Sequence, residues 1–214
     1  MSNGFFISFE GVEGAGKSTQ ARLLAEALQA AGRQVLLTRE PGGTPVSEEL
    51  RRIVKHTPGD TPLCAEAELL IMAASRAQLM RQVILPFLAQ GGVVVCDRFA
   101  DSTTVYQGYA RGLDLNVIAQ VNALATGGRW PDLTFILDLP VDVGFARVNR
   151  RAVTDSATVH DRFEAEAREF HEKVRAGFQA LAQQQPQRIR LLLADSGVEE
   201  LQARIRALTA ERLA

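Results

Sequence analysis

The chain has 214 residues, of which 46% are hydrophobic and 23% charged, as expected of one globular domain. Its formal net charge of −1 excludes a general attraction to nucleic acid or anionic lipid, so any basic site must be local. Its two cysteines, Cys64 and Cys96, exclude a disulfide framework, and no signal sequence or membrane-length apolar run is present, which predicts a cytoplasmic protein.

Short apolar runs alternate with helical patterns along the whole chain. Strands are predicted at residues 5–9, 34–38, 93–96, 133–137 and 189–193. Helices are predicted at residues 18–31, 46–55, 63–90, 116–125, 141–150, 162–183 and 198–213, with a kink at Pro86 in the third. Continuous apolar strands that alternate with helices predict a five-stranded parallel sheet flanked by helices on both faces, in an α/β fold.

The first predicted strand and helix are joined by the sequence GVEGAGKST, residues 11–19. Gly11, Gly16, Lys17 and Ser18 fit the phosphate-binding loop pattern, in which backbone N–H groups and a helix N-terminus surround phosphate oxygens. An ordinary glycine-rich turn is the alternative, but the full spacing, the lysine and the hydroxyl favour nucleotide phosphates.

Two arginines follow directly after predicted strands, each beside an acid. Arg39 precedes Glu40 and follows the second strand, while Arg98 follows Asp97 after the third. Arginine suits phosphate because its planar fork donates two parallel hydrogen bonds, and an acid in the position of Asp97 helps to hold Mg²⁺ in phosphate-loop enzymes. The alternative is that Arg39–Glu40 and Asp97–Arg98 are structural ion pairs, but two such pairs at strand ends favour a binding site.

A third basic cluster contains Arg147, Arg150 and Arg151 and is followed by small and polar residues. The pattern predicts a mobile lid at about residues 147–161 that closes over a triphosphate and brings positive charge. A solvated basic helix end is the alternative.

The predicted helix around residues 69–74 is apolar on nearly every side. Such a helix is buried, either in the core or partly against a second subunit.

Six segments, in chain order, resemble the bacterial thymidylate kinases: FEGVEGAGKST, REPGGT, ELLIMAASRAQ, DRFADSTTVYQG, PDLTFILDLP and DRFE. The resemblance extends from Phe9 to the C-terminal helix. It implies the phosphate-loop (P-loop) NTPase fold with a mobile lid, transfer of the γ-phosphoryl of ATP to dTMP to give dTDP and ADP in dTTP biosynthesis, Mg²⁺ as cofactor, and a homodimer built through apolar helices, without nucleic acid or membrane partners.

The resemblance also implies roles for residues, by position. The catalytic residues are Lys17, Glu13, Arg98, Arg150 and Arg151, and the metal ligands are Ser18, Glu13 and Asp97. Residues that bind ATP are Gly11, Val12, Glu13, Gly14, Ala15, Gly16, Lys17, Ser18, Thr19, Arg147 and Ser196. Residues that bind dTMP are Arg39, Glu40, Pro41, Met72, Arg76, Arg98, Ser102, Thr103, Tyr106 and Gln107.

Three details refine this assignment. Glu13 is expected to face the acceptor side of the site, and Arg76 is expected to hydrogen-bond the thymine. Met72 stands where the family commonly has an aromatic residue that stacks on thymine. The phosphate loop itself has no arginine, which strengthens the catalytic interpretation of the lid arginines.

Three other functions compete with this interpretation. Another nucleoside monophosphate kinase is the main alternative, although REPGGT and YQG disfavour it. A GTPase-type switch lacks the N-K-x-D stretch for guanine. A nucleotide-binding subunit without activity is disfavoured by the several arginines expected on the acceptor side.

Overall fold

A single parallel sheet forms the centre of the molecule. The computed structural model describes residues 4–56, 63–154, 162–163 and 166–213. Its sheet has the strand order β2-β3-β1-β4-β5, built from β1 (Phe5–Gly11), β2 (Val35–Arg39), β3 (Val93–Asp97), β4 (Leu133–Asp138) and β5 (Ile189–Leu193). Every strand pair is parallel, which confirms the predicted sheet.

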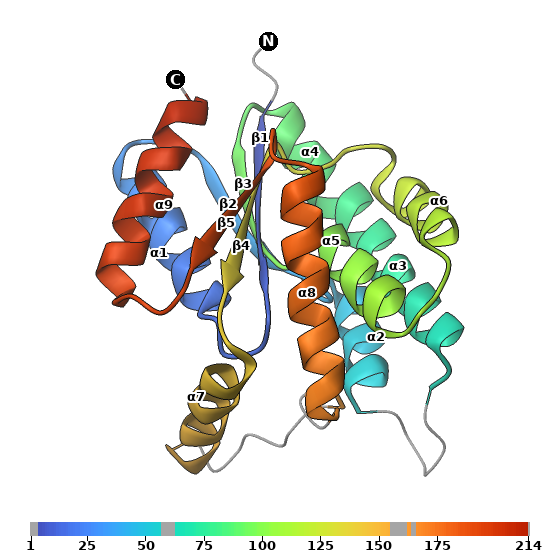
Figure 1. Ribbon diagram of the computed structural model, residues 1–214. Coiled ribbons are helices and arrows are strands. Elements are labelled where there is room, and N and C mark those ends of the chain that lie inside the picture. The colour runs from blue at the N-terminus through green and yellow to red at the C-terminus, as the bar shows by residue number, and fades with distance from the viewer. Residues whose placement is uncertain (1–3, 57–62, 155–161, 164–165, 214) are drawn as a thin grey trace.

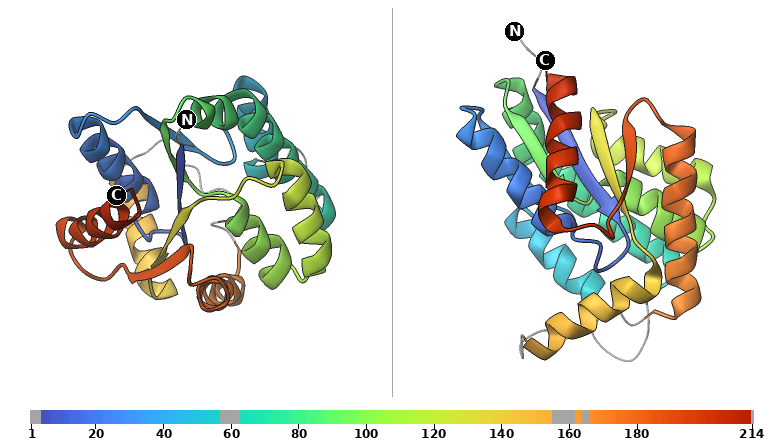
Figure 2. Two further views of the ribbon diagram at one scale, coloured as in Figure 1. Left: turned by 90° about the horizontal axis from the view of Figure 1, so that it is seen from above. Right: turned by 60° about the vertical axis from the view of Figure 1, so that its left-hand side comes forward.

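Helices cover both faces of this sheet (Figures 1 and 2). On one face lie α1 (Lys17–Ala30) and α9 (Val198–Leu213), and on the other lie α3 (Ala65–Leu79), α4 (Leu85–Ala89), α5 (Ala100–Thr103) and α8 (Arg168–Gln184). The helices α2 (Pro45–Lys55) and α6 (Leu115–Thr126) pack against α3. The helix α7 (Val141–Thr154) stands at the carboxyl ends of the strands, away from both termini (Figure 1).

The predicted helix at 63–90 is a continuous helical run with an irregular middle. Between α3 and α4 lies the π-helical segment η1 (Met80–Ile84), and Pro86 stands in the first turn of α4. Because proline has no N–H and its ring clashes with the carbonyl of residue i−4, a π-helical turn is a common way to accommodate it. A π-helical segment therefore precedes Pro86, and the kink at Pro86 stays a prediction.

One helical stretch was missed and one boundary was wrong. No helix was predicted between residues 97 and 115, but the stretch after Asp97 forms α5 and the π-helical segment η2 (Thr104–Ala110). All four residues of α5 are buried, so tertiary packing outweighs the low helix propensity of its serine and threonine. The helix predicted to begin at 162 begins at Arg168, after a turn that buries Phe163.

The apolar helix α3 is buried on one face only. Leu69 and Met72 are buried, whereas Leu70 is 60% exposed. On the adjacent α6, Leu124 is 81% and Val117 49% exposed. The core therefore accounts for only part of the apolar surface of these two helices.

None of the described helices combines the length and the hydropathy that crossing a membrane requires. The predicted cytoplasmic location stays a prediction.

Candidate functional site

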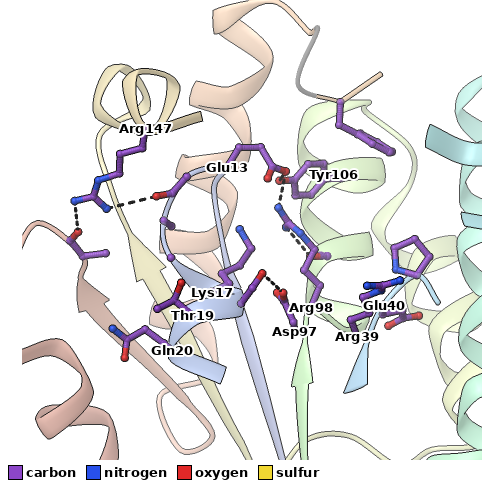
Figure 3. Close-up of a pocket in the computed structure, with 18 of the residues that line it drawn as sticks. Glu13, Lys17, Thr19, Gln20, Arg39, Glu40, Asp97, Arg98, Tyr106 and Arg147 are labelled. Carbon is purple, nitrogen blue, oxygen red and sulfur yellow. Dashed lines mark hydrogen bonds and ion pairs between the residues drawn. The ribbon is translucent and has the colours of Figure 1, made fainter. Parts of the chain in front are cut away.

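A cavity of about 720 Å³ opens at the carboxyl ends of the strands, where the segments that follow β1, β2, β3 and β5 meet α7. Ligands collect at this edge in parallel α/β sheets. Figure 3 shows Arg147 at one side of this cavity, Lys17 near the middle, and Arg98, Glu40 and Arg39 toward the other side. Arg39 and Arg98, expected to form a binding site at the ends of the second and third strands, both line this cavity.

Glycine geometry shapes the phosphate-binding loop. Gly11, Gly14 and Gly16 all have positive φ angles, of 134°, 73° and 89°. A Cβ on Gly11 would lie 2.4 Å from the carbonyl oxygen of Leu137, and a Cβ on Gly14 would lie 2.4 Å from that of Gly144. Only glycine combines this backbone with such close approaches, so the loop sits directly against β4 and α7.

The N-terminus of α1 points into the cavity without a side-chain cap. Gly16 is the N-cap residue, and no acidic residue stands in the first turn. The first N–H groups of the helix and its positive dipole end are therefore available to an anion.

Lys17 is nearly buried in the loop, and its Nζ donates a hydrogen bond to the carbonyl of Val12 at 2.7 Å. Burial and the charge of Arg98 lower its pKa to about 8, against the opposing effects of Glu13 and Asp97. A bound phosphate would stabilise the charged form.

Ser18 and Asp97 form a hydroxyl–carboxylate pair beside Lys17. The Ser18 hydroxyl donates to Asp97 Oδ2, and the buried Asp97 Oδ1 has no hydrogen-bond partner. Hydroxyl and carboxylate oxygens are ligands that Mg²⁺ prefers, and this ion usually takes its other ligands from water and phosphate. The two side chains therefore fit a magnesium ion that is shared with a nucleotide.

Glu13 lies on the Arg98 side of the loop (Figure 3). Its Oε1 accepts hydrogen bonds from Arg98 Nη2 at 2.5 Å and from the Tyr106 hydroxyl at 3.1 Å. Burial opposes the charge of Glu13, but Arg98 and Lys17 prevail and lower its pKa to about 2. Burial raises the pKa of Tyr106 well above its ordinary value, so its hydroxyl stays a donor.

The two neighbour ion pairs that were the alternative to a binding site do not form. Arg39 bonds Glu48 at 3.1 Å instead of Glu40. Arg98 bonds Glu13 and not Asp97. The alternative that Arg39–Glu40 and Asp97–Arg98 are structural ion pairs was therefore wrong.

Arg76 and Thr103 are exceptions among the predicted dTMP-binding residues, because they do not line the cavity. Arg76 is fully buried, with Nε 2.7 Å from Glu40 Oε1 and hydrogen bonds to Asn122 and Thr103. Glu40 therefore lies between Arg76 and the cavity, whereas Arg76 was expected to hydrogen-bond the thymine directly. The remaining predicted residues of this set line the cavity: Arg39, Glu40, Pro41, Met72, Arg98, Ser102, Tyr106 and Gln107.

Arg147 reaches the cavity from α7. It donates to the carbonyls of Gly14, at 3.4 Å, and Ala194, at 3.1 Å, on the side where Ser196 also lines the cavity. Arg150 is exposed and lies outside the lining. The side chain of Arg151 and the rest of the predicted lid, residues 155–161, are outside the described residues.

Arg51 and Lys55 of α2 also line the cavity, which the sequence analysis missed. Their spacing of four residues places them on one face of the helix that follows REPGGT, and this spacing was the available signal. They add positive charge on the side of Arg39.

Known proteins resemble this chain over nearly its whole length. The profile of the thymidylate kinase family matches residues 9–205. The thymidylate kinase of Syntrophotalea carbinolica is 47% identical over 98% of this chain and 96% of its own length. That of a Synechococcus strain is 50% identical over 97% and 95%. The crystal structure of thymidylate kinase from Ehrlichia chaffeensis superposes with a TM-score of 0.74 at 33% identity, covering 99% of both chains.

Proposed function

We propose that this chain, which belongs to the thymidylate kinase family, holds its two nucleotides on opposite sides of the phosphate loop. As a member of that family it transfers a phosphoryl group from ATP to dTMP and forms dTDP and ADP. What remains to be assigned is which residues bind each substrate and which act on the reacting phosphates.

ATP binds on the side of Arg147 and Ser196 in this proposal. The uncapped N-terminus of α1 and the N–H groups from Gly14 to Thr19 would hold its phosphates. Lys17 would reach the β- and γ-phosphates. The Ser196 hydroxyl is buried without a hydrogen-bond partner and lines the cavity, so it is available to the nucleoside.

dTMP binds on the side of Arg98. The guanidinium of Arg98 is fixed against Glu13 and lies 5.1 Å from the centre of the Tyr106 ring, which prepares it to hold the acceptor phosphate. The thioether of Met72 lies against the thymine, where it still contributes dispersion contacts in place of a stacking ring. Gln107 Oε1, buried and without a partner, is available to accept a hydrogen bond from the base.

Ser18 and Asp97 would hold Mg²⁺, which neutralises charge on the phosphates when it is bound. Glu13 is a weaker candidate ligand than predicted, because Oε1 of its carboxylate already accepts from Arg98 and Tyr106. We assign Glu13 to the acceptor side, where it orients Arg98.

The reaction needs no covalent nucleophile on the protein. The acceptor phosphate attacks the γ-phosphoryl in line, and the transition state spreads negative charge over the moving oxygens. Lys17 and a lid arginine stabilise that charge, while Arg98 and Arg39 offset the charge of the acceptor phosphate that would otherwise repel the donor. Closure of the lid excludes water, which would compete as the acceptor.

The observation that carries this assignment is the paired Arg98 and Glu13 in the same cavity as Lys17. An ATP-consumption assay over a panel of nucleoside monophosphates tests the acceptor side. We expect dTMP to be best, dUMP to lose ~1–3 kcal/mol in transition-state binding for its missing methyl group, and cytidylate and adenylate to react far more slowly. Equal rates with cytidylate and dTMP would overturn the assignment in favour of a broader monophosphate kinase.

We also propose that the protein is a cytoplasmic homodimer joined through α3 and α6. The exposed Leu70, Val117 and Leu124 of these helices are the support for this interface.

A further inference from the structure

Arg98 has an unusual backbone conformation. Its φ angle is +69°, the only positive value among the non-glycine residues that the structure describes. A residue with a Cβ rarely adopts this left-handed region, and it persists there only where the surroundings impose it. The conformation turns the chain sharply at the end of β3, between Asp97 and α5. Something must therefore hold this turn.

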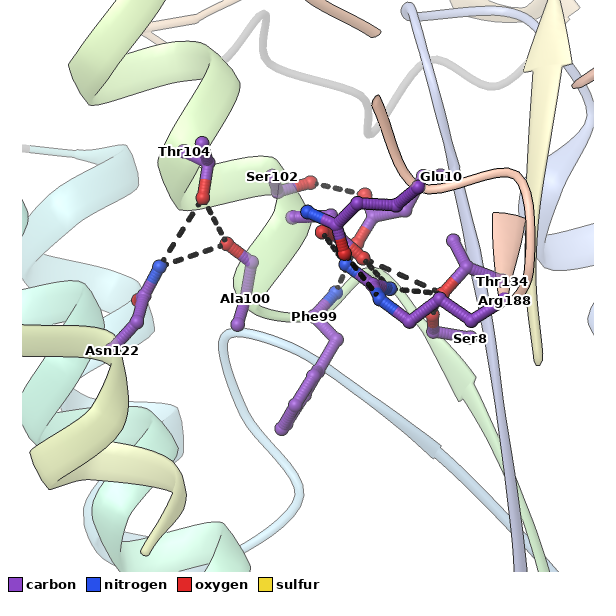
Figure 4. A network of polar contacts seen from close by, with 11 residues as sticks. Ser8, Glu10, Phe99, Ala100, Ser102, Thr104, Asn122, Thr134 and Arg188 are labelled. Atoms are coloured by element: carbon purple, nitrogen blue, oxygen red, sulfur yellow. Dashed lines mark hydrogen bonds and ion pairs between the residues drawn. The ribbon is translucent and has the colours of Figure 1, made fainter. Parts of the chain in front are cut away.

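Glu10, near the end of β1, lies beside this turn, close to Phe99 and Ser102 (Figure 4). Its side chain is fully buried. Oε1 accepts a hydrogen bond from the backbone N–H of Phe99 at 2.7 Å, directly after Arg98. Oε2 accepts a hydrogen bond from the Ser102 hydroxyl at 2.5 Å. The two oxygens of one carboxyl group thus hold the chain on the C-terminal side of Arg98 at two points.

The second of these contacts continues to the guanidinium of Arg98. Ser102 Oγ accepts a hydrogen bond from Arg98 Nη1 at 3.2 Å, and Nη1 also donates to the carbonyl of Gly11 at 3.2 Å. Gly11 is the residue directly after Glu10. Glu10 therefore supports both the backbone and the side chain of Arg98 without itself lining the cavity.

We propose that Glu10 is the positioning residue for Arg98: it holds the left-handed turn and, through Ser102, the guanidinium that grips the acceptor phosphate. This inference depends on the proposed role of Arg98. Glu10 was not predicted from the sequence, although a lone charged residue in the apolar run FFISFEG was a signal.

Burial disfavours the charged form of Glu10. Burial and the neighbouring Asp101 raise its pKa to about 8, and the bonds from Ser102 and Phe99 together with the charge of Arg98 act against this. Asp101 itself is satisfied by another partner, because both of its oxygens accept from Arg188 at 2.7 Å.

The neighbouring polar groups provide a matched control. Thr134 is fully buried in the same layer, and within the part of the chain that the structure describes its side-chain hydrogen bonds go to Ser8, Asp101 and Arg188, away from Arg98. Thr134→Val removes a buried hydroxyl near Glu10 at nearly constant volume. Any effect of disturbing this polar layer in general appears in that variant as well.

The test compares binding of dTMP with binding of thymidine, which lacks the phosphate, by titration calorimetry. Glu10→Asp keeps the carboxyl group but is one methylene shorter, so it cannot reach Phe99 and Ser102 together. We expect its affinity for dTMP to fall about 10- to 100-fold, with the affinity for thymidine and the KM for ATP unchanged. Glu10→Gln keeps the length and one acceptor, and it should stay within about threefold of the wild type. Thr134→Val should bind both ligands normally.

Three results overturn the inference. One is a folded Glu10→Asp protein with wild-type affinity for dTMP, and another is an equal loss for dTMP and thymidine. The third is a matching loss in Thr134→Val. Arg98→Ala tests the proposed role of Arg98 separately. If Arg98 grips the acceptor phosphate, this variant must bind dTMP more weakly while its affinity for thymidine is unchanged. If Glu10→Asp does not fold, Glu10→Ala takes its place. A loss of affinity for dTMP but not for thymidine in that variant supports the inference, and wild-type affinity for dTMP overturns it.

Discussion

Lys17 shows how a single side chain is prepared for a ligand. The residue is only 7% exposed, in a site where burial and Arg98 disfavour the charge of its ammonium group. Its hydrogen bond to Val12 keeps it inside the loop until a phosphate is present. Lys17 is thus already in position to bind an anion before one is present. The core of the protein does not depend on this lysine.

We expect Lys17→Met to lower kcat at least about 10³-fold, since the charge on the transferred phosphoryl group loses its fixed cation. The free energy of unfolding at pH 7 should change by less than ~1 kcal/mol, because the variant no longer has to bury a charge. Steady-state kinetics and chemical denaturation of the ligand-free protein check both parts. A variant that unfolds, or that keeps most of its turnover, contradicts the assigned role.

The lowered pKa of Lys17, about 8, predicts how ATP binding depends on pH. Below pH 8 the lysine is charged in the free protein. Above pH 8 it is neutral, and ATP must bind together with a proton, so the affinity should fall by up to about tenfold for each further pH unit. Calorimetric titration with ATP between pH 7 and pH 9.5 measures this, and Lys17→Met should show no such slope. A flat wild-type profile contradicts the prediction.

At the scale of elements, the backbone of α7 packs directly against the backbone of the phosphate loop. Gly144 of α7 lies so close to the loop that an added Cβ would come within 2.5 Å of the carbonyl oxygen of Glu13. Arg147, one turn further, donates to Gly14 and Ala194. A movement of α7 is therefore transmitted directly to the loop and to the segment after β5.

We expect the three arginines of α7 to act differently. Arg147→Ala should raise the KM for ATP, because Arg147 lines the cavity beside the loop. Arg151→Ala, and next Arg150→Ala, should lower kcat and kcat/KM together, as expected of charges that meet the phosphoryl group only after closure. An arginine of this kind contributes about 10³–10⁵ in rate.

Kinetics with both substrates varied distinguish these outcomes. If all three alanine variants keep a near-normal kcat, the cluster is a solvated helix end and the catalytic cation lies elsewhere.

At the scale of the whole molecule, the exposed apolar residues of α3 and α6 predict a second subunit. Leu124→Lys, at the most exposed of these side chains, should convert the dimer to a monomer because it places an unpaired charge in an apolar interface. Size-exclusion chromatography with light scattering gives the mass directly. Leu193→Lys, which changes an equally apolar and 54% exposed residue at the end of β5, is the control and should leave the mass unchanged. A wild-type protein with the mass of one chain at micromolar concentration would contradict the interface.

The sequence by itself determined the features that depend on neighbours in the chain. The phosphate loop is a run of consecutive residues whose glycines and helix start act locally, so Gly11, Gly16, Lys17 and Ser18 were identified from spacing alone. The parallel sheet was predicted because continuous apolar strands alternate with helices, and each strand was found within a few residues.

Only the tertiary structure decided which charged groups meet. Arg39 pairs with Glu48, Glu40 with Arg76, and Arg98 with Glu13. Each of these three arginines has an oppositely charged residue that is nearer in the sequence than its actual partner. Strand order and the direction of each strand end determine these pairs, and no local pattern encodes them. The same reason explains Glu10 and the helix after Asp97: contacts from distant segments stabilise a left-handed arginine and a helix of poor propensity, which the local sequence would not adopt alone.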